Sequence, residues 1–185
     1  MKIKLLIIRW GVFLLAMVVV PLVIQVAPAA SQEHEFVGVK KCALCHKKPE
    51  QGEQVRIWEE SKHAKAYETL GTPAAKEVAA KLGIDNPQTS GKCLKCHSTA
   101  YGFTEAKVTE TVPVEEGISC ESCHGPGKDY SKKSVMEDRA QAITLGLVIP
   151  NEQTCQKCHN SESPSYKPFD FKERWEQIKH PVPPK

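Results

Sequence analysis

The sequence predicts a mostly α-helical, irregular fold of short helices and loops, and three observations support this prediction. Helix start and stop signals recur at short intervals along the chain. Aromatic residues make up only 6% of the 185 residues, so side chains alone would form a thin core. The third observation is the cysteine content, because eight cysteines fall in four closely spaced pairs.

Four segments carry the signals of a helix at one or both ends. They are residues 54–70, 73–82, 134–145 and 171–179. In the first, His63 lies on an apolar face by helical spacing. The second has Thr72 as its cap and Pro73 at its first position. In the third, Ser134 and Glu137 are spaced as a capping box.

Each of the four cysteine pairs is spaced C-x-x-C and is followed directly by histidine. In chain order, motifs 1 to 4 are Cys42, Cys45 and His46; Cys93, Cys96 and His97; Cys120, Cys123 and His124; and Cys155, Cys158 and His159. Histidine is only 7 of the 185 residues, so four such followers do not arise by chance. C-x-x-C-H is the attachment motif of c-type haem.

The chemistry of haem attachment explains this spacing. Two thiols three residues apart lie near one side of a helical turn, where both can add to the vinyl groups of one porphyrin. The histidine that follows then binds the iron as an axial ligand. The sequence therefore predicts four covalently bound haem c groups, closely stacked, with the short helices and loops wrapped around them. Their porphyrin faces would supply the apolar area that the side chains lack.

Other uses of paired cysteines explain less of the pattern. Disulfides suit an oxidising compartment but need no histidine after each pair. Zinc sites use C-x-x-C pairs, yet two four-ligand sites would leave the adjacent histidines unexplained. A thioredoxin-type redox pair would occur once, beside a βαβ pattern.

Residues 1–29 are predicted to be a secretory signal peptide, followed by a single tetrahaem cytochrome c domain over residues 30–185. The segment begins with Lys2, Lys4 and Arg9, continues with an apolar run over residues 10–24, and ends in the small residues Ala27-Pro28-Ala29. Export implies a periplasmic protein. The alternative is an uncleaved membrane anchor, although the run is at the short edge of a bilayer span.

The charge balance argues against a nucleic-acid partner. The chain has 25 basic and 22 acidic residues, for a formal net charge of +3. The signal segment carries that excess, so the remaining chain is balanced and lacks the strongly basic composition that nucleic-acid binding requires.

Histidines outside the motifs are the candidates for the sixth ligand of each iron. They are His34, His63 and His180, three residues for four irons. Met136 is the only methionine after residue 29, and its helical neighbours favour a packing role. At least one haem is therefore expected to lack a sixth ligand from the protein.

Several segments resemble the cytochrome c-554 family of tetrahaem electron carriers. They are Val37-Gly38 before motif 1, residues 61–67 around His63, residues 117–127 around motif 3, and residues 155–181 from motif 4 onward. The resemblance implies a helical, monomeric, periplasmic protein with three haems ligated by two histidines and one five-coordinate haem. It also implies that His63 binds the haem of His124 and that the open haem is that of motif 2.

In one respect the sequence departs from that family. A spare histidine is expected between motifs 2 and 3, yet residues 98–119 contain none. Either His34 takes its place or a second haem is open.

Three functions are compatible with these motifs. The simplest is an electron carrier, not an enzyme, between donor and acceptor redox proteins. An alternative is a haem enzyme that reduces a small nitrogen species at an open haem, with Tyr67, Tyr101 and Tyr130 as possible proton donors. The third is a quinol-oxidising subunit anchored in the membrane, which requires that residues 1–29 are retained.

Overall fold

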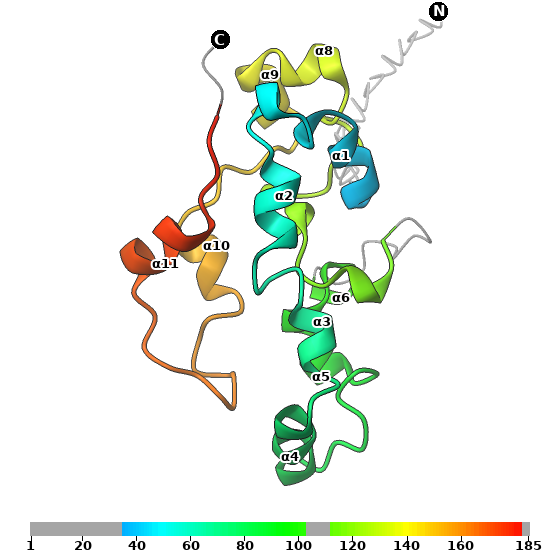
Figure 1. The fold of residues 1–185 in the computed structure, drawn as a ribbon, viewed down its shortest axis with the longest axis vertical. Helices are drawn as coiled ribbons and strands as arrows, with labels where there is room; N and C mark the ends of the chain where they lie inside the picture. The colour runs from blue at the N-terminus through cyan, green and yellow to red at the C-terminus, as the bar shows by residue number, and fades with distance from the viewer. Residues whose placement is uncertain (1–34, 103–111, 183–185) are drawn as a thin grey trace, which may run out of the picture. The chain divides into compact units, whose positions relative to one another are not determined.

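A computed structural model describes residues 35–102 and 112–182, and within them the chain is helical with no strand (Figure 1). The α-helices are α1 (Val39–His46), α2 (Gln54–Glu59), α3 (Ala66–Thr69), α4 (Pro73–Lys81), α5 (Gly91–His97), α6 (Thr99–Gly102), α7 (Cys120–His124), α8 (Lys133–Met136), α9 (Arg139–Thr144), α10 (Glu152–Gln156) and α11 (Phe171–Ile178), and the 3-10 turns are η1 (Pro49–Gln51) and η2 (Val114–Glu116). These short helices, joined by loops and turns, confirm the predicted fold class. The predicted signal peptide and His34 lie outside the described residues.

Side chains form only small apolar clusters in the described part of the chain. One joins Phe36, Ala100 and Val112, and the other is centred on Tyr130 and Ala142. A domain of this length normally builds one contiguous core. The thin core predicted from the low aromatic content is therefore present in the structure.

The helix predicted over residues 54–70 is interrupted in its middle. Helix α2 ends at Glu59 and α3 begins at Ala66. Between them, the carbonyl oxygen of His63 accepts a hydrogen bond from Ile118 N at 3.0 Å, and Trp58 Nε1 donates to Ile118 O at 2.7 Å. These tertiary bonds hold the segment in turns, and no local sequence pattern encodes them.

Helix α4 follows its predicted signals closely. Thr72 Oγ1 accepts from Ala75 N at 3.3 Å, and Pro73 is the first helical residue. The helix ends one residue earlier than predicted, at Lys81. Helix α11 likewise ends at Ile178, one residue before its predicted end, and Asp170 caps it by accepting from Glu173 N at 2.9 Å.

The capping box predicted at Ser134 and Glu137 is wrong. Residues 134–145 are divided between α8 and α9, and α8 has no side-chain cap. Asp138 instead begins α9, because its carboxylate accepts from Ala140 N and Gln141 N at 2.9 and 3.1 Å. An aspartate between the two halves provides a stronger N-cap than the expected pair, and it starts a new helix.

A buried threonine joins the end of motif 2 to the start of motif 3. Thr99 is 1% exposed, and its N–H and hydroxyl both donate to Gly117 O, at 2.7 and 3.0 Å. Its Oγ1 also accepts from Ser119 N at 2.7 Å. Helices α6 and α7 are in contact around this junction, which fixes where motif 3 begins relative to motif 2.

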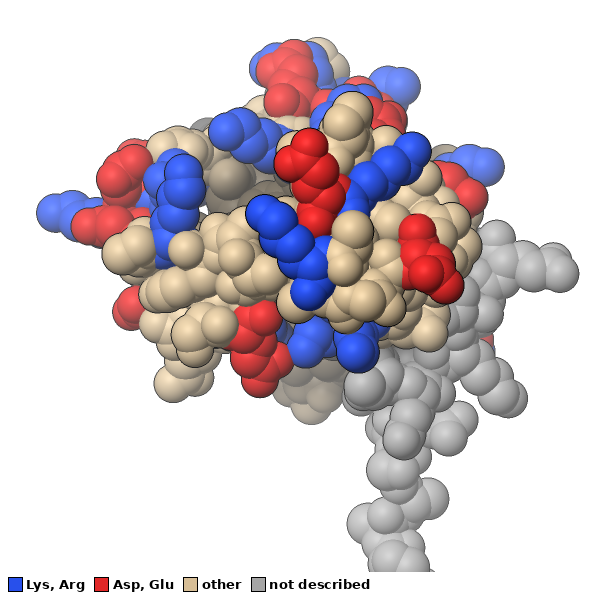
Figure 2. Space-filling model, turned by 90° about the horizontal axis from the view of Figure 1, so that it is seen from below, with Lys and Arg blue, Asp and Glu red and all other residues tan. Residues whose placement is uncertain are grey.

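The surface of the described residues carries mixed charge. Figure 2 shows basic and acidic side chains interspersed over one face, with neither sign forming a continuous patch there. Among the described helices, none is both long and apolar enough to cross a bilayer.

Candidate functional site

The motifs lie on short helices that present their cysteines and histidines together. Helices α1, α5 and α7 end at His46, His97 and His124, respectively. Motif 4 begins in α10, and its second cysteine and His159 follow in a turn. The predicted helical turn therefore holds the two cysteines of motifs 1 to 3, with the histidine as the last helical residue.

In three motifs the histidine ring is held through its Nδ1 atom. His46 Nδ1 lies 3.2 Å from Gln54 Oε1, His97 Nδ1 lies 2.8 Å from Ala66 O, and His124 Nδ1 lies 3.1 Å from Val148 O. A carbonyl oxygen can only accept, so the proton is on Nδ1 and the lone pair is on Nε2. Such a bond orients a metal-binding imidazole and fixes its tautomer.

Two of the spare histidines lie beside motif histidines. The ring centroids of His63 and His159 are 6.0 Å apart, and those of His124 and His180 are 5.8 Å apart. Imidazole nitrogens bind first-row metals at about 2 Å, so two imidazoles on opposite sides of one iron have centroids about 6 Å apart. Both pairs therefore have the spacing of axial ligands to a single iron.

This pairing differs from the one that the resemblance implies for His63. That histidine was expected to serve the haem of motif 3, but it lies beside His159 of motif 4. His180 occupies the place beside motif 3 instead. The backbone of His63 is held at this place by Ile118, in a turn between α2 and α3 rather than in a straight helix.

Burial keeps these imidazoles neutral. It is the largest cause that lowers the pKa of His63, and the neighbouring His159 lowers it further. Burial likewise lowers the pKa values of His124, His159 and His180. Nδ1 of His180 is buried without a hydrogen-bond partner. Neutral rings with an unused nitrogen are the form in which histidine binds a metal.

None of the eight cysteines is in a disulfide, and interactions between their side chains indicate which motifs are neighbours. A hydrogen bond between the Cys42 and Cys120 side chains lowers the pKa of the Cys42 thiol, and so joins motifs 1 and 3. A similar bond to Cys158 lowers the pKa of Cys96 to about 7 and joins motifs 2 and 4. Burial raises the pKa of Cys123 to about 11, and the next cause is Cys155 of motif 4. Together with the contact between α1 and α7, these interactions indicate the order 1, 3, 4, 2 when neighbouring motifs are joined through their cysteines.

An ion pair supports the contact between motifs 2 and 4. Lys95 Nζ, on α5, lies 2.8 Å from Glu162 Oε2, three residues after His159. Both side chains are largely exposed, so the pair adds little stability. The ion pair shows instead that motifs 2 and 4, which are far apart in the sequence, lie close together in the fold.

The donor set fits haem better than the competing uses of cysteine. No disulfide forms among the eight thiols. Within residues 35–102 and 112–182, no three histidine, cysteine or acidic residues gather closely enough to hold a metal ion between them. The structure has the features that covalently held haems require. They are paired imidazoles about 6 Å apart, an unpartnered buried ring nitrogen and a thin apolar core.

Gln54 is a candidate site residue that the sequence did not indicate. Its Oε1 holds His46, while its Nε2 donates to Pro181 O at 2.9 Å, directly after His180. One side chain thus connects the histidine of motif 1 to the segment that carries His180. No local pattern could have found it, because its partners are 8 and 127 positions away.

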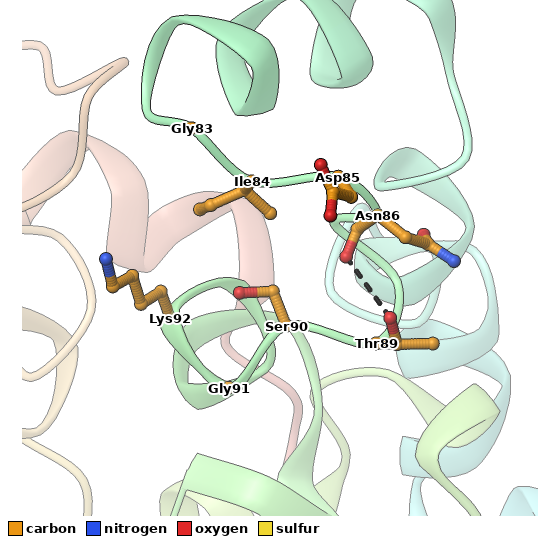
Figure 3. A pocket seen from close by; sticks show the side chains of 8 residues that line it. All are labelled: Gly83, Ile84, Asp85, Asn86, Thr89, Ser90, Gly91 and Lys92. Atoms are coloured by element: carbon orange, nitrogen blue, oxygen red, sulfur yellow. Dashed lines mark hydrogen bonds between the residues drawn. The ribbon is translucent and has the colours of Figure 1, made fainter.

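A surface hollow lies next to motif 2 but contains none of the candidate haem residues. Figure 3 shows it between the end of α4 and the start of α5, where Thr89 Oγ1 donates to Asn86 O at 3.3 Å. Its lining is Gly83, Ile84, Asp85, Asn86, Thr89, Ser90, Gly91 and Lys92. It has no motif cysteine or histidine and is not counted as part of the site.

A helical chain whose C-x-x-C-H motifs lie side by side, with paired imidazoles, is a c-type cytochrome. Comparison with known proteins gives the family: the model of "Cytochrome c554 and c-prime" matches residues 41–125. Cytochrome c-554 of Nitrosomonas europaea is 32% identical over 139 residues. These cover 67% of this chain and 57% of the relative, so the chain spans little more than half of that protein.

A solved structure agrees with the sequence relationship. The reduced state of cytochrome c554 from Nitrosomonas europaea matches with a TM-score of 0.52 and 28% identity, over 78% of each chain. The chain belongs to the cytochrome c-554 family, as the sequence resemblance predicted. Covalently bound haem c is the cofactor of c-type cytochromes, and the residues described above are those expected to hold it.

Proposed function

We propose that this protein is a periplasmic tetrahaem electron carrier, which passes electrons between donor and acceptor redox proteins along a row of haems. The observation that carries this proposal is that the motifs lie near one another: α1 contacts α7, the ion pair of Lys95 with Glu162 joins motif 2 to motif 4, and the charge of Cys155 of motif 4 acts on Cys123 of motif 3. Each haem would be anchored next to another, so no electron needs to cross a long gap. Haem c supplies a one-electron couple between ferric and ferrous iron.

In this proposal the cysteines attach and orient each haem. Each thiol adds across a vinyl group, so that sulfur bonds to one vinyl carbon and the thiol hydrogen goes to the other. All eight cysteines are used, two for each haem. Three of the motif histidines would present Nε2 to the iron, because their Nδ1 atoms are held by Gln54, Ala66 and Val148.

The sixth ligands follow from the imidazole pairs. His63 would bind the haem of motif 4 opposite His159, and His180 the haem of motif 3 opposite His124. Motifs 1 and 2 have no such partner among the described residues, and His34 is the remaining histidine. With one histidine for two irons, at least one of these two haems would be open, and the family resemblance favours motif 2.

The N-terminal segment determines where the carrier works. We take residues 1–29 as a cleaved signal peptide that exports residues 30–185 to the periplasm, where haem attachment and redox partners are found. Retention of this segment would make the protein membrane-anchored. The mass of the purified protein distinguishes the two forms directly.

Haem counting and a redox titration together test the function. The holoprotein should gain the mass of four haems, retain them in acid-acetone, and take up four electrons per chain. The haems are numbered here by their motifs. Replacing Cys120 and Cys123 with serine should remove haem 3, the second haem of the row. Haem 1 should then be reduced more slowly when electrons enter at haem 2. A carrier with fewer than four haems, or one whose haems exchange no electrons with each other, would contradict the proposal.

A further inference from the structure

A buried glutamate inside motif 3 connects that motif to the start of motif 1. Glu121 lies between Cys120 and Cys123 and is 1% exposed. Its carboxylate accepts from Val37 N at 2.9 and 3.1 Å, from Gly38 N at 2.8 Å, and from Gly127 N at 2.6 Å. Val37 and Gly38 directly precede α1, the helix of motif 1.

The site is suited to a carboxylate rather than to an amide. Three N–H groups converge on its two oxygens, and only a carboxylate offers acceptors at both positions. An amide at the same place would turn its own N–H₂ group toward at least one donor. Burial raises the pKa of the Glu121 carboxyl, and the hydrogen bonds from Val37, Gly127 and Gly38 act against that rise by favouring the ionised form.

A second glutamate strengthens the same connection. Both oxygens of Glu116 lie 3.2 Å from Val39 N, the first residue of α1. The amide groups at the start of a helix have no partner within it, and negative charge there is favourable. Glu116 and Glu121 together therefore bind three consecutive amides and place α1 against α7, where Cys42 and Cys120 meet.

We propose that Glu121 is a positioning residue for electron transfer, which fixes haem 1 beside haem 3 and lowers the reduction potentials of these two haems by its negative charge. The inference rests on the proposed function. Adding an electron to a haem is less favourable next to a buried negative charge, because the low dielectric of the interior strengthens repulsion. The charge lies within motif 3 and is bonded directly to Gly38, four residues before Cys42 of motif 1, so it acts on this pair more strongly than on haems 2 and 4.

The test compares four variants in a potentiometric titration of the holoprotein. Glu121→Gln should raise two of the four midpoint potentials and leave the other two unchanged. Glu116→Gln should raise the same two potentials by a smaller amount, because Glu116 is less buried and its removal leaves the Glu121 contacts in place. This second variant keeps the charge effect measurable if Glu121→Gln does not fold.

Glu152→Gln is the matched control, since Glu152 also lies close in sequence to a motif cysteine, three residues before Cys155, but is exposed. It should leave all four potentials unchanged. Glu121→Asp should keep the two potentials low, because it keeps the charge, yet slow electron exchange between haems 1 and 3, because its shorter side chain cannot reach all three amides.

Equal potentials in Glu121→Gln and the parent protein, or equal shifts in Glu121→Gln and Glu152→Gln, would overturn the inference. The same measurements on the parent protein distinguish a failure of this inference from a failure of the proposed function. If it holds four haems and exchanges electrons among them while Glu121→Gln changes nothing, only the role of Glu121 is refuted.

Discussion

The approach of Gly117 to His63 offers a direct test of how His63, the proposed sixth ligand of the haem of motif 4, is held. Gly117 has φ +69° and ψ −144°, a conformation that other residues rarely adopt. A Cβ added there would lie 2.8 Å from His63 O and 2.9 Å from Ala64 O. Both atoms belong to the backbone, so they cannot move aside cheaply, and Gly117→Ala should displace His63 from its place beside His159.

The expected cost has two parts. A non-glycine residue in this conformation costs about 1–3 kcal/mol. The displacement also breaks the hydrogen bond from Ile118 N to His63 O, which contributes about 0.5–1.5 kcal/mol. The sum of about 2–4 kcal/mol should lower the melting temperature by about 5–15 °C for a chain of this size.

The informative assay is electron paramagnetic resonance of the oxidised protein. Loss of His63 as a ligand should convert one low-spin haem to high spin in Gly117→Ala. Gly83→Ala is the matched control, because Gly83 also has a positive φ, +66°, but its added Cβ would have no neighbour within 4 Å. If Gly117→Ala keeps every low-spin signal and is no less stable than Gly83→Ala, the assignment of His63 to haem 4 is wrong.

Four further predictions follow from the same contacts. His63→Met should raise one reduction potential far more than the others, since methionine opposite histidine favours ferrous iron, and four unchanged potentials in a redox titration would show that His63 is no ligand. His180→Ala should make a different haem high-spin from the one affected by His63→Ala, and a loss of the same spectroscopic signal in both variants would contradict the two imidazole pairs. The unaltered oxidised protein should already show a high-spin signal and bind cyanide at that haem, whereas four purely low-spin haems would mean that another group closes the site. Tyr130→Phe removes the hydrogen bond to Gly125 O at 2.7 Å and leaves a buried carbonyl unpartnered, so chemical denaturation should show a loss of about 1–3 kcal/mol, with unchanged potentials as the sign that this role is structural.

The sequence predicted the parts of the fold that local patterns encode. Thr72 and Pro73 start α4 where expected, and the four C-x-x-C-H motifs indicated the cofactor and the family. These features depend on residues within a few positions of each other, and their chemistry allows few alternatives. The family and the mostly helical fold are confirmed, while the ligand role of each residue stays a prediction.

Features that depend on long-range contacts could not be predicted from the sequence. The break between α2 and α3 depends on hydrogen bonds from Ile118 to His63 and from Trp58 to Ile118. The sequence around His63 does not predict these bonds. The same is true of the neighbour of His63, which is His159 rather than the His124 that the family resemblance implied. Gln54 and Glu121 are similar cases, because their roles appear only when distant segments meet.

The order of the motifs in space has a consequence for how the chain matures. Motifs 1 and 2 are consecutive in the sequence, yet they stand at opposite ends of the row 1, 3, 4, 2. A chain that stopped before Cys155 would hold three motifs, and motif 2 would keep its connection to motif 3 through Thr99 but lose its neighbour in motif 4. In the proposed carrier, the haem that joins those of motifs 3 and 2 is therefore attached to the last motif to be synthesised.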